Sequence, residues 1–461
     1  MKNNNYRKKD LFIDDFDKQK ALLDLSEIIK CKSISYRDQS KMDFSEFKKI
    51  HNYIFSSFPY INKYASYKVI NEGSIYFTIK GKDESLPYGL FMGHIDVVPP
   101  VNENEWEEEP FSGKIDDSYI YGRGALDMKS IDVALLNAIE YSLKKYGQPQ
   151  RGIYLCFGHD EETLGLKGQW MIKEDLKANN ASLAFVLDEG GGLVDGTPFS
   201  CSKPLLINNV MEKGFMNVII ESFSSGGHSS NPSFSPCLGN VAKAIDQICS
   251  HPFKSKLNEP LKIFLNSIAP YITDPILKEL VENMSSKESE LLAYLEKSPT
   301  YAPYVKTTIA PTQIESNSSG ANVLPSYVKA LINLRLQDGD DVNYVKQYIL
   351  DLTKDIDVKV TFKEELNASK ISSLDSEIFS LLKDISSSYY DAIYVPFLTI
   401  GGTDCCFYNE LCSSCYRFAP RGEEFSLASG VHGMNEKIDI DAYIYLIKFY
   451  IEFINKSCYI K

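Results

Sequence analysis

The chain has 461 residues, of which 44% are hydrophobic and 24% charged, and its formal net charge at pH 7 is −13. This is the composition of a soluble globular protein with enough apolar material for more than one domain. The negative charge argues against nucleic acid or an anionic membrane as a partner. No apolar run reaches the ~20 residues that a membrane-spanning helix needs.

The N-terminus is basic, but no apolar segment typical of a signal peptide follows it. We therefore expect a cytoplasmic protein whose ten cysteines are reduced thiols. Several of them gather at 405–415, where a CxxC makes a structural zinc site conceivable. Small buried cysteines are the better interpretation of that cluster.

Helical and strand patterns alternate along the first 207 residues. Apolar residues recur at helical spacing in three segments: 15–30, 43–58 and 128–147. Short apolar runs typical of buried strands occur in four: 74–81, 88–96, 152–160 and 182–191. This alternation predicts an α/β fold with a mixed, mostly parallel sheet and helices on both faces.

The pattern changes near residue 208 and returns near residue 366. Residues 215–224 and 326–337 read as half-buried strands, and a long amphipathic helical region lies between them at 238–297. We therefore predict an α+β domain at 208–365, inserted into a first domain made of 1–207 and 366–461.

Charged side chains collect where the predicted strands end. His94 and Asp96 are two residues apart at the end of one strand, so both can face one site. Further acidic residues follow before a helix and at two other strand ends: Asp127, Glu161, Glu162, Asp188 and Glu189. Ligands of open α/β sheets bind beyond the carboxyl ends of the strands. Asp127 alone could be a helix N-cap, but so many neighbouring carboxylates require a cation.

The residue types indicate which cation. Histidine with carboxylate suits zinc, and also cobalt or manganese. His432 lies in a loop of small residues, which is typical of a ligand delivered by a loop. Asp127, Glu162 and Asp188 would bring three negative charges and a bridging hydroxide a fourth, which favours two divalent ions over one. His228 is flanked by glycines within the inserted domain, which favours a functional role for it as well.

Five motifs occur in the order found in a known superfamily: GHIDVVP, GRGALDMK, GHDEETLG, LDEGG and GVHGMNE. With them the chain resembles, over nearly its whole length, the di-zinc aminoacylase/carboxypeptidase superfamily of metallopeptidases. The segment GGTDCCFYNELCSSCYRFAP is similar to the carboxypeptidase S-like branch. The resemblance implies a zinc-peptidase-like catalytic domain with an inserted lid and dimerisation domain.

The resemblance also implies roles for the residues of the catalytic domain. The ligands of two zinc ions would be His94 and Asp188 for one, Glu162 and His432 for the other, and Asp127 between them. At LDEGG, Glu189 is the alternative to Asp188. Asp96 would orient His94, and Glu161 would be the general base.

The lid and a nearby loop would supply the substrate contacts. His228 matches the histidine that stabilises the oxyanion, which in dimeric members comes from the partner subunit. Asn322 and Arg335 match substrate-binding residues, and an arginine suits a free carboxylate. The loop that would line the pocket contains Gly401, Gly402 and Asp404.

The function implied is a zinc-dependent hydrolase that releases an amino acid. It would cleave a peptide or N-acyl amide bond next to a free carboxylate in a small substrate. Relatives in the branch carry a basic residue and a histidine where this chain has Cys406 and Phe407, which leaves substrate preference open. The alternatives are a specialised biosynthetic deacetylase or desuccinylase, and a catalytically silent binding scaffold. A monomer and a homodimer through the lid are both compatible with the sequence.

Overall fold

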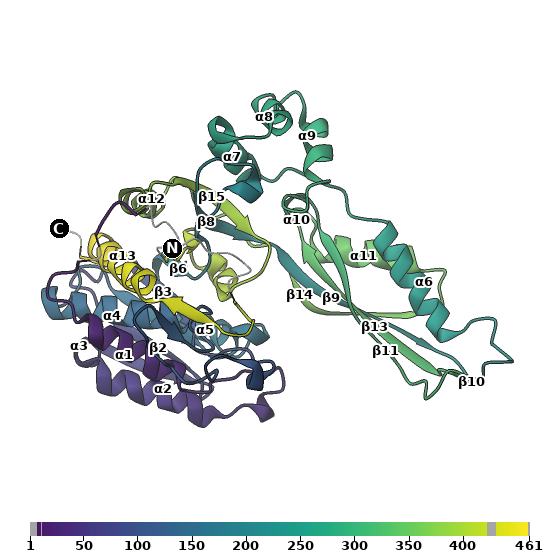
Figure 1. Ribbon diagram of the computed structural model, residues 1–461, viewed down its shortest axis with the longest axis horizontal. Helices are drawn as coiled ribbons and strands as arrows, with labels where there is room; N and C mark the ends of the chain where they lie inside the picture. Colours follow the sequence, from purple (N-terminus) through teal and green to yellow (C-terminus); the bar gives the residue numbers. More distant parts are fainter. Residues whose placement is uncertain (1–6, 11, 422–429, 460–461) are drawn as a thin grey trace. The chain divides into compact units, whose positions relative to one another are not determined.

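The computed structural model describes residues 7–10, 12–421 and 430–459, and the chain divides into two compact units (Figure 1). The first unit comprises Met1–Val210, Ile371–Phe397 and Thr403–Lys461. The second comprises Met211–Lys370 and Leu398–Gly402. The second unit is thus inserted into the sequence of the first.

A nine-stranded mixed sheet runs through the described part of the first unit. Its order is β1-β2-β5-β3-β6-β16-β8-β15, with β7 beside β8. The strands span Ala65–Ile70 (β1), Ser74–Ile79 (β2), Tyr88–His94 (β3), Ile153–Gly158 (β5), Leu183–Asp188 (β6), Gly192–Val194 (β7), Leu205–Glu212 (β8), Ile393–Thr399 (β15) and Cys415–Arg417 (β16). In the centre, β3 is parallel to β5 and β6, and β6 is parallel to β16. Toward the edges β1–β2, β2–β5 and β7–β8 are antiparallel.

Helices cover both faces of this sheet, as the alternation along β3 shows. Phe91 belongs to the larger core, whereas Leu90 and Met92 point to the opposite face. The larger core is formed with α1 (Lys18–Ile29), α2 (Phe44–Ser57), α3 (Pro59–Tyr64), α4 (Lys129–Tyr146), α12 (Glu377–Tyr389) and α13 (Ile440–Cys458). On the other face, Ile172 and Leu176 of α5 (Gln169–Ala178) pack against the sheet. The predicted α/β class is confirmed.

The second unit is built on a four-stranded antiparallel sheet of order β11-β13-β9-β14. The strands span Gly214–Phe223 (β9), Thr308–Ser316 (β11), Tyr327–Leu336 (β13) and Lys359–Leu366 (β14). Every second residue of β13 is buried. These residues pack against α6 (Cys237–Ser250) and α11 (Val342–Thr353), so helices cover one face.

The helical region expected at 238–297 is divided into separate helices in the structure. Four helices occupy it: α6, α7 (Glu259–Ile268), α8 (Pro275–Glu282) and α9 (Glu288–Leu295). The prolines Pro260 and Pro275 stand in the first turns of α7 and α8, two residues and one residue after the capping residues Asn258 and Asp274. Proline suits a first helical turn but cannot lie inside a helix, so the region is divided.

The remaining elements are short. They are β4 (Tyr119–Tyr121), β10 (Gly227–His228), α10 (Ala302–Val305), β12 (Val323–Leu324) and β17 (Lys437–Asp439). β4 pairs with β17, and β10 pairs with β12. Among the described residues, none of the helices combines the length and apolarity needed to cross a membrane.

Candidate metal centre

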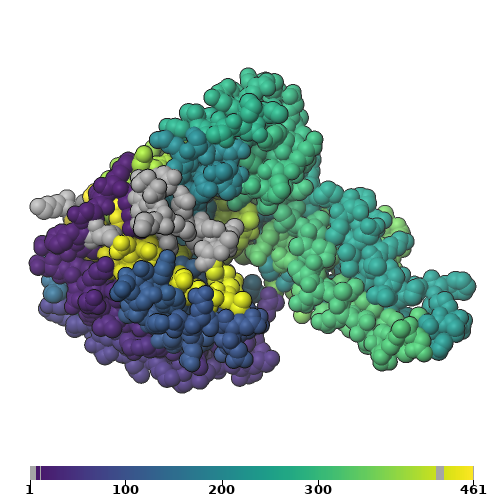
Figure 2. Space-filling model, in the orientation of Figure 1, coloured from purple at the N-terminus to yellow at the C-terminus, as the bar shows by residue number. Residues whose placement is uncertain are grey.

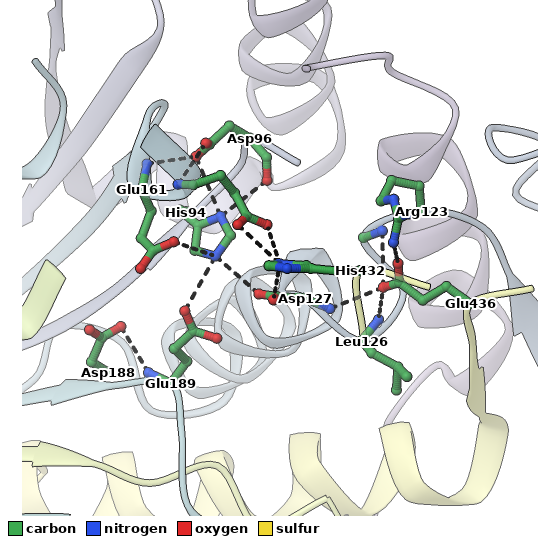
Figure 3. Close-up of polar contacts among 12 residues, drawn as sticks. His94, Asp96, Arg123, Leu126, Asp127, Glu161, Asp188, Glu189, His432 and Glu436 are labelled. Atoms are coloured by element: carbon green, nitrogen blue, oxygen red, sulfur yellow. Dashed lines mark hydrogen bonds and ion pairs between the residues drawn. The ribbon is translucent and has the colours of Figure 1, made fainter. Parts of the chain in front are cut away.

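Three neighbouring strands of the first unit end at the site. β3 ends at His94, and its parallel neighbours β5 and β6 end at Gly158 and Asp188. Because parallel strands present their carboxyl ends at one edge of the sheet, the residues that follow them converge (Figure 3).

His94 is the centre of this group, with a side chain that is only 1% exposed. Its Nε2 lies 3.2 Å from Asp127 Oδ1 and 3.3 Å from Glu189 Oε1. Its Nδ1 lies 3.1 Å from the carbonyl oxygen of Asp96 and 3.4 Å from the Asp96 carboxylate. Asp96 thus holds the ring so that Nε2 faces the two other carboxylates, which is the role expected for it.

His432 faces the same aspartate from the opposite side. Its Nε2 lies 3.1 Å from Asp127 Oδ2 and 3.0 Å from Glu162 Oε2. Asp127 therefore presents one carboxylate oxygen to His94 and the other to His432 (Figure 3). This is the arrangement of a carboxylate shared between two sites.

Asp96 has a second role that the sequence did not indicate. Its two carboxylate oxygens accept the backbone N–H groups of Glu161 and Glu162, each at 3.2 Å. One aspartate thus fixes both the His94 ring and the turn that carries the adjacent glutamates. Glu161 Oε2 lies 3.9 Å from His94 Nε2, farther than either Asp127 or Glu189.

The structure brings Glu189, and not Asp188, to His94. The Asp188 carboxylate accepts the backbone N–H groups of Glu189 at 2.8 Å and of Cys405 at 3.0 Å. Consecutive residues at a strand end point to opposite sides, so only one of the pair can face the site. The choice of Asp188 as ligand does not fit this geometry, and the alternative, Glu189, does.

The electrostatics of the cluster call for a cation. Burial raises the pKa of the Glu161 carboxyl well above its usual value and that of Glu162 to about 7. Hydrogen bonds to Asp127 and Glu162 raise the pKa of His432 to about 10. Burial disfavours the charged form of a carboxyl group, and nearby like charges add to this effect. Two divalent cations would offset both the cost of burying charged carboxylates and the repulsion between them.

The donor atoms suit such ions. Among the residues that the structure describes, two groups bring their donor atoms close enough to hold a metal ion: His94 with Glu161 and Glu189, and His94 with Asp127 and Glu162. Both offer imidazole nitrogen and carboxylate oxygen, which fits zinc, cobalt or manganese. Neither group contains a cysteine, so the 405–415 cluster gains no support as a metal site.

Two of the predicted substrate residues meet in the second unit. His228 lies in β10, paired with Val323 of β12, and the N–H of the next residue donates to the Asn322 carbonyl at 3.0 Å. Residues around β10 are exposed, and this turn forms a tip of the second unit in the space-filling view (Figure 2).

Arg335 lies in the four-stranded sheet, at the end of β13 away from the β10–β12 pair. β13 begins with Tyr327 beside Phe223, the last residue of β9 before the β10 turn. Eight residues later Arg335 pairs with Phe215, over whose ring the guanidinium lies at 4.7 Å. At about 3.3 Å per residue this separation is roughly 26 Å. The structure therefore does not bring Arg335 together with His228 within one chain.

The loop expected to line the pocket divides between the units. Gly401 and Gly402 group with the second unit and Asp404 with the first. Asp404 is only 4% exposed. A Cβ on Gly165, whose φ is +66°, would lie 1.7 Å from its Oδ1, so the Asp404 carboxylate is packed against the Glu161–Thr163 turn. The Asp404 carboxylate is thus buried close to the turn that carries Glu161, and its part in a pocket stays a prediction.

Comparisons with known proteins identify the family of the chain. The sequence model of peptidase family M20/M25/M40 matches residues 90–456. Probable carboxypeptidase S-like 2 of Dictyostelium discoideum is 32% identical over 439 residues, covering 94% of this chain and 84% of that protein. The mouse N-fatty-acyl-amino acid synthase/hydrolase PM20D1 is 31% identical, over 92% of this chain and 85% of its own.

A solved structure has the same fold. It is the M20 family metallo-carboxypeptidase Sso-CP2 from Sulfolobus solfataricus, with a TM-score of 0.71 and 21% identity over 94% of this chain and 98% of that one. The resemblance inferred from the motifs is thus confirmed, and the chain belongs to peptidase family M20/M25/M40.

Proposed function

We propose that this chain is a hydrolase with two divalent metal ions, zinc in the first instance, that cleaves a peptide or N-acyl amide bond next to a free carboxylate and releases an amino acid. The observation that carries the proposal is the Asp127 carboxylate, whose two oxygens face the two histidines at 3.2 and 3.1 Å. A single-metal site would not need an aspartate placed in this way.

Each ion would have its own ligands in addition to Asp127. His94 and Glu189 would hold one ion, and Glu162 with His432 the other. The three carboxylates carry three negative charges, more than a single divalent cation can offset. When bound, such a pair of ions polarises the scissile carbonyl and makes a water molecule nucleophilic near neutral pH.

Glu161 would act as the general base. It is the buried carboxylate farthest from His94 Nε2 among those in contact with it, which leaves it free for proton transfer. Burial raises the pKa of its carboxyl well above the usual value, so this group holds a proton more readily than an exposed glutamate does. Glu161 would take a proton from the attacking water and give it to the leaving nitrogen.

The relatives support the substrate class. A carboxypeptidase-like protein and an N-fatty-acyl-amino acid hydrolase share one product, a free amino acid, and one bond, an amide next to a carboxylate. Arg335 would bind that carboxylate. An apolar acyl group is the second candidate, because Cys406 and Phe407 make the segment after Asp404 uncharged.

A homodimer would complete the site. Arg335 lies roughly 26 Å along β13 from Tyr327, the end of that strand that follows the β10–β12 pair, too far for one small substrate to touch both His228 and Arg335. If both act on the same substrate, they come from different copies of the chain. All ten cysteines are free thiols in the structure, which supports the cytoplasm as the compartment.

The test is amino-acid release from a panel of dipeptides and N-acyl amino acids by the zinc-loaded protein. Glu161→Gln should lower kcat by about 100-fold or more and keep the metals. Glu174→Gln, at an exposed glutamate of the same unit, is the matched control and should behave as wild type. No release from either class by the loaded protein would contradict the proposed activity. Release that persists in Glu161→Gln would contradict the role of Glu161.

A further inference from the structure

Beside the metal centre lies a buried ion pair that the proposed reaction does not use. Arg123 Nη1 donates to Glu436 Oε2 at 2.6 Å, and their side chains are 1% and 0% exposed (Figure 3). Arg123 belongs to the segment that ends in Asp127, and Glu436 follows His432 by four residues. The pair therefore joins the two loops that carry these proposed ligands.

Glu436 holds the Asp127 loop by its backbone. Its Oε1 accepts the N–H groups of Gly124 at 3.1 Å, Leu126 at 2.7 Å and Asp127 at 3.1 Å. Hydrogen bonds to a charged acceptor are stronger than those to a neutral one. Three donors on a single oxygen fix the course of the backbone up to Asp127 itself.

Arg123 holds the His432 loop in return. Its Nη2 donates to the carbonyl of Gly433, the residue next to His432, at 3.0 Å. The backbone N–H of Gly122 donates to the Glu436 carbonyl at 2.9 Å. Directly beyond, Lys437 of β17 pairs with Tyr121 of β4. Each loop thus contributes a side chain that binds the backbone of the other loop.

Fold stability alone does not explain this choice of residues. Apolar residues of similar volume often stabilise an interior as well as a buried ion pair does. Burial raises the pKa of the Glu436 carboxyl, and the charge of Arg123 opposes that rise. The pair is neutral as a whole, so it adds no net charge next to Asp127.

We propose that Glu436 is a positioning residue, which sets the distance between Asp127 and His432 by clamping their two loops together. This inference rests on the proposed di-metal function. Of the two ions, the one held by Asp127, Glu162 and His432 depends more on the clamp, because two of its three ligands lie on the clamped loops. The other ion also has His94 and Glu189, which the clamp does not contact.

The experiment measures zinc binding by competition with a chelator, together with the absorption spectrum of the cobalt-loaded protein. In Glu436→Gln, the ion held by Asp127, Glu162 and His432 should bind about 10- to 100-fold less tightly. This is the range typical for loss of a residue that supports a metal ligand without binding the metal. The affinity for the other ion, held with His94 and Glu189, should change little. The cobalt spectrum should lose the contribution of one site, a change that a merely structural role would not produce.

Glu140→Gln is the matched control. The Glu140 carboxylate also accepts backbone N–H groups, those of Tyr60 at 3.0 Å and Ile61 at 2.8 Å. It lies eleven residues into α4, roughly 17 Å along the helix from its first residue. This variant should lower the melting temperature of the apoprotein as Glu436→Gln does, and bind both ions as wild type does.

Other results would overturn the proposal in distinguishable ways. If wild type binds two ions and Glu436→Gln binds both with wild-type affinity, or weakens both equally, the clamp is contradicted and the di-metal function stands. If wild type binds fewer than two ions, the di-metal function fails and the clamp with it. If Glu436→Gln does not fold, Arg123→Lys keeps the charge but cannot bridge Glu436 and Gly433. It should weaken the same ion, and wild-type binding would again contradict the clamp.

Discussion

The two units bring their polar residues together in different ways. In the first, parallel strands end at one edge, and side chains from distant parts of the sequence meet within about 3 Å of His94 or His432. In the second, His228 lies in the short β10–β12 pair, whereas Arg335 lies near the far end of β13 in the four-stranded sheet. In the proposed homodimer, one chain would complete the metal centre, whereas the substrate contacts would come from both copies.

The strongest test of the metal centre in the first unit is Asp127→Asn, which replaces the carboxylate shared by both histidines with an amide. We expect kcat/KM to fall by more than about 100-fold. Even the loss of a residue that only supports a metal ligand lowers metal affinity or activity by about 10- to 100-fold. Metal content should fall below two ions per chain. The control is Asp175→Asn, since Asp175 pairs with Lys68 at the surface of the same unit. Full activity of Asp127→Asn would refute a shared ligand.

The substrate contacts proposed for the second unit are tested by mixing two inactive variants. His228→Ala and Arg335→Ala should each lower kcat/KM by about 100-fold, as loss of an oxyanion or carboxylate contact does. If the two residues act across a dimer, random mixing of subunits makes half of the dimers mixed, each with one intact site of two. Activity should then return to about a quarter of wild type. A mixture that exchanges subunits but stays inactive would place both residues in one chain's site, or outside it.

A smaller effect distinguishes two adjacent acidic residues. Glu189→Gln should weaken zinc binding by about tenfold or more, because Glu189 faces His94 at 3.3 Å. Asp188→Asn should change zinc affinity less, because Asp188 holds the backbone N–H groups of Glu189 and Cys405. Chelator competition measures both, and the reverse order would restore Asp188 as the ligand.

The smallest effect concerns the packing beneath the metal centre. Gly165→Ala should lower the free energy of unfolding by roughly 1–3 kcal/mol, since its Cβ would lie 1.7 Å from Asp404 Oδ1. Gly147→Ala is the matched control, because φ is +73° there but the nearest atom is 3.5 Å away. The difference between the two variants in denaturant unfolding isolates crowding from backbone strain. Equal losses would mean that Asp404 can move aside.

The sequence predicted the first unit well because its signals are local. Buried strands are continuous apolar runs, and the charged residues directly after them could only lie at one edge of the sheet. The adjacent Asp188 and Glu189 could not be separated, because which of them faces inward depends on how the backbone turns after β6. β16, with only Cys415–Arg417, is too short to show a pattern.

Other features depend on contacts across the chain. Glu436 reads as an ordinary acidic residue in GMNEK, and only the structure shows its oxygen beneath three N–H groups of residues 124–127. Arg123 and Glu436 belong to the motifs GRGALDMK and GVHGMNE, but the motifs do not indicate that the two residues form a pair. The separation of Arg335 from His228 follows from strand direction, which motif order does not contain.

The most direct test is a crystal structure of the zinc-loaded protein, with the ions located by their anomalous scattering. The account predicts two ions, one on each side of the Asp127 carboxylate, the first bound by His94 and Glu189 and the second by Glu162 and His432. A single ion, or two ions of which neither contacts Asp127, would contradict it.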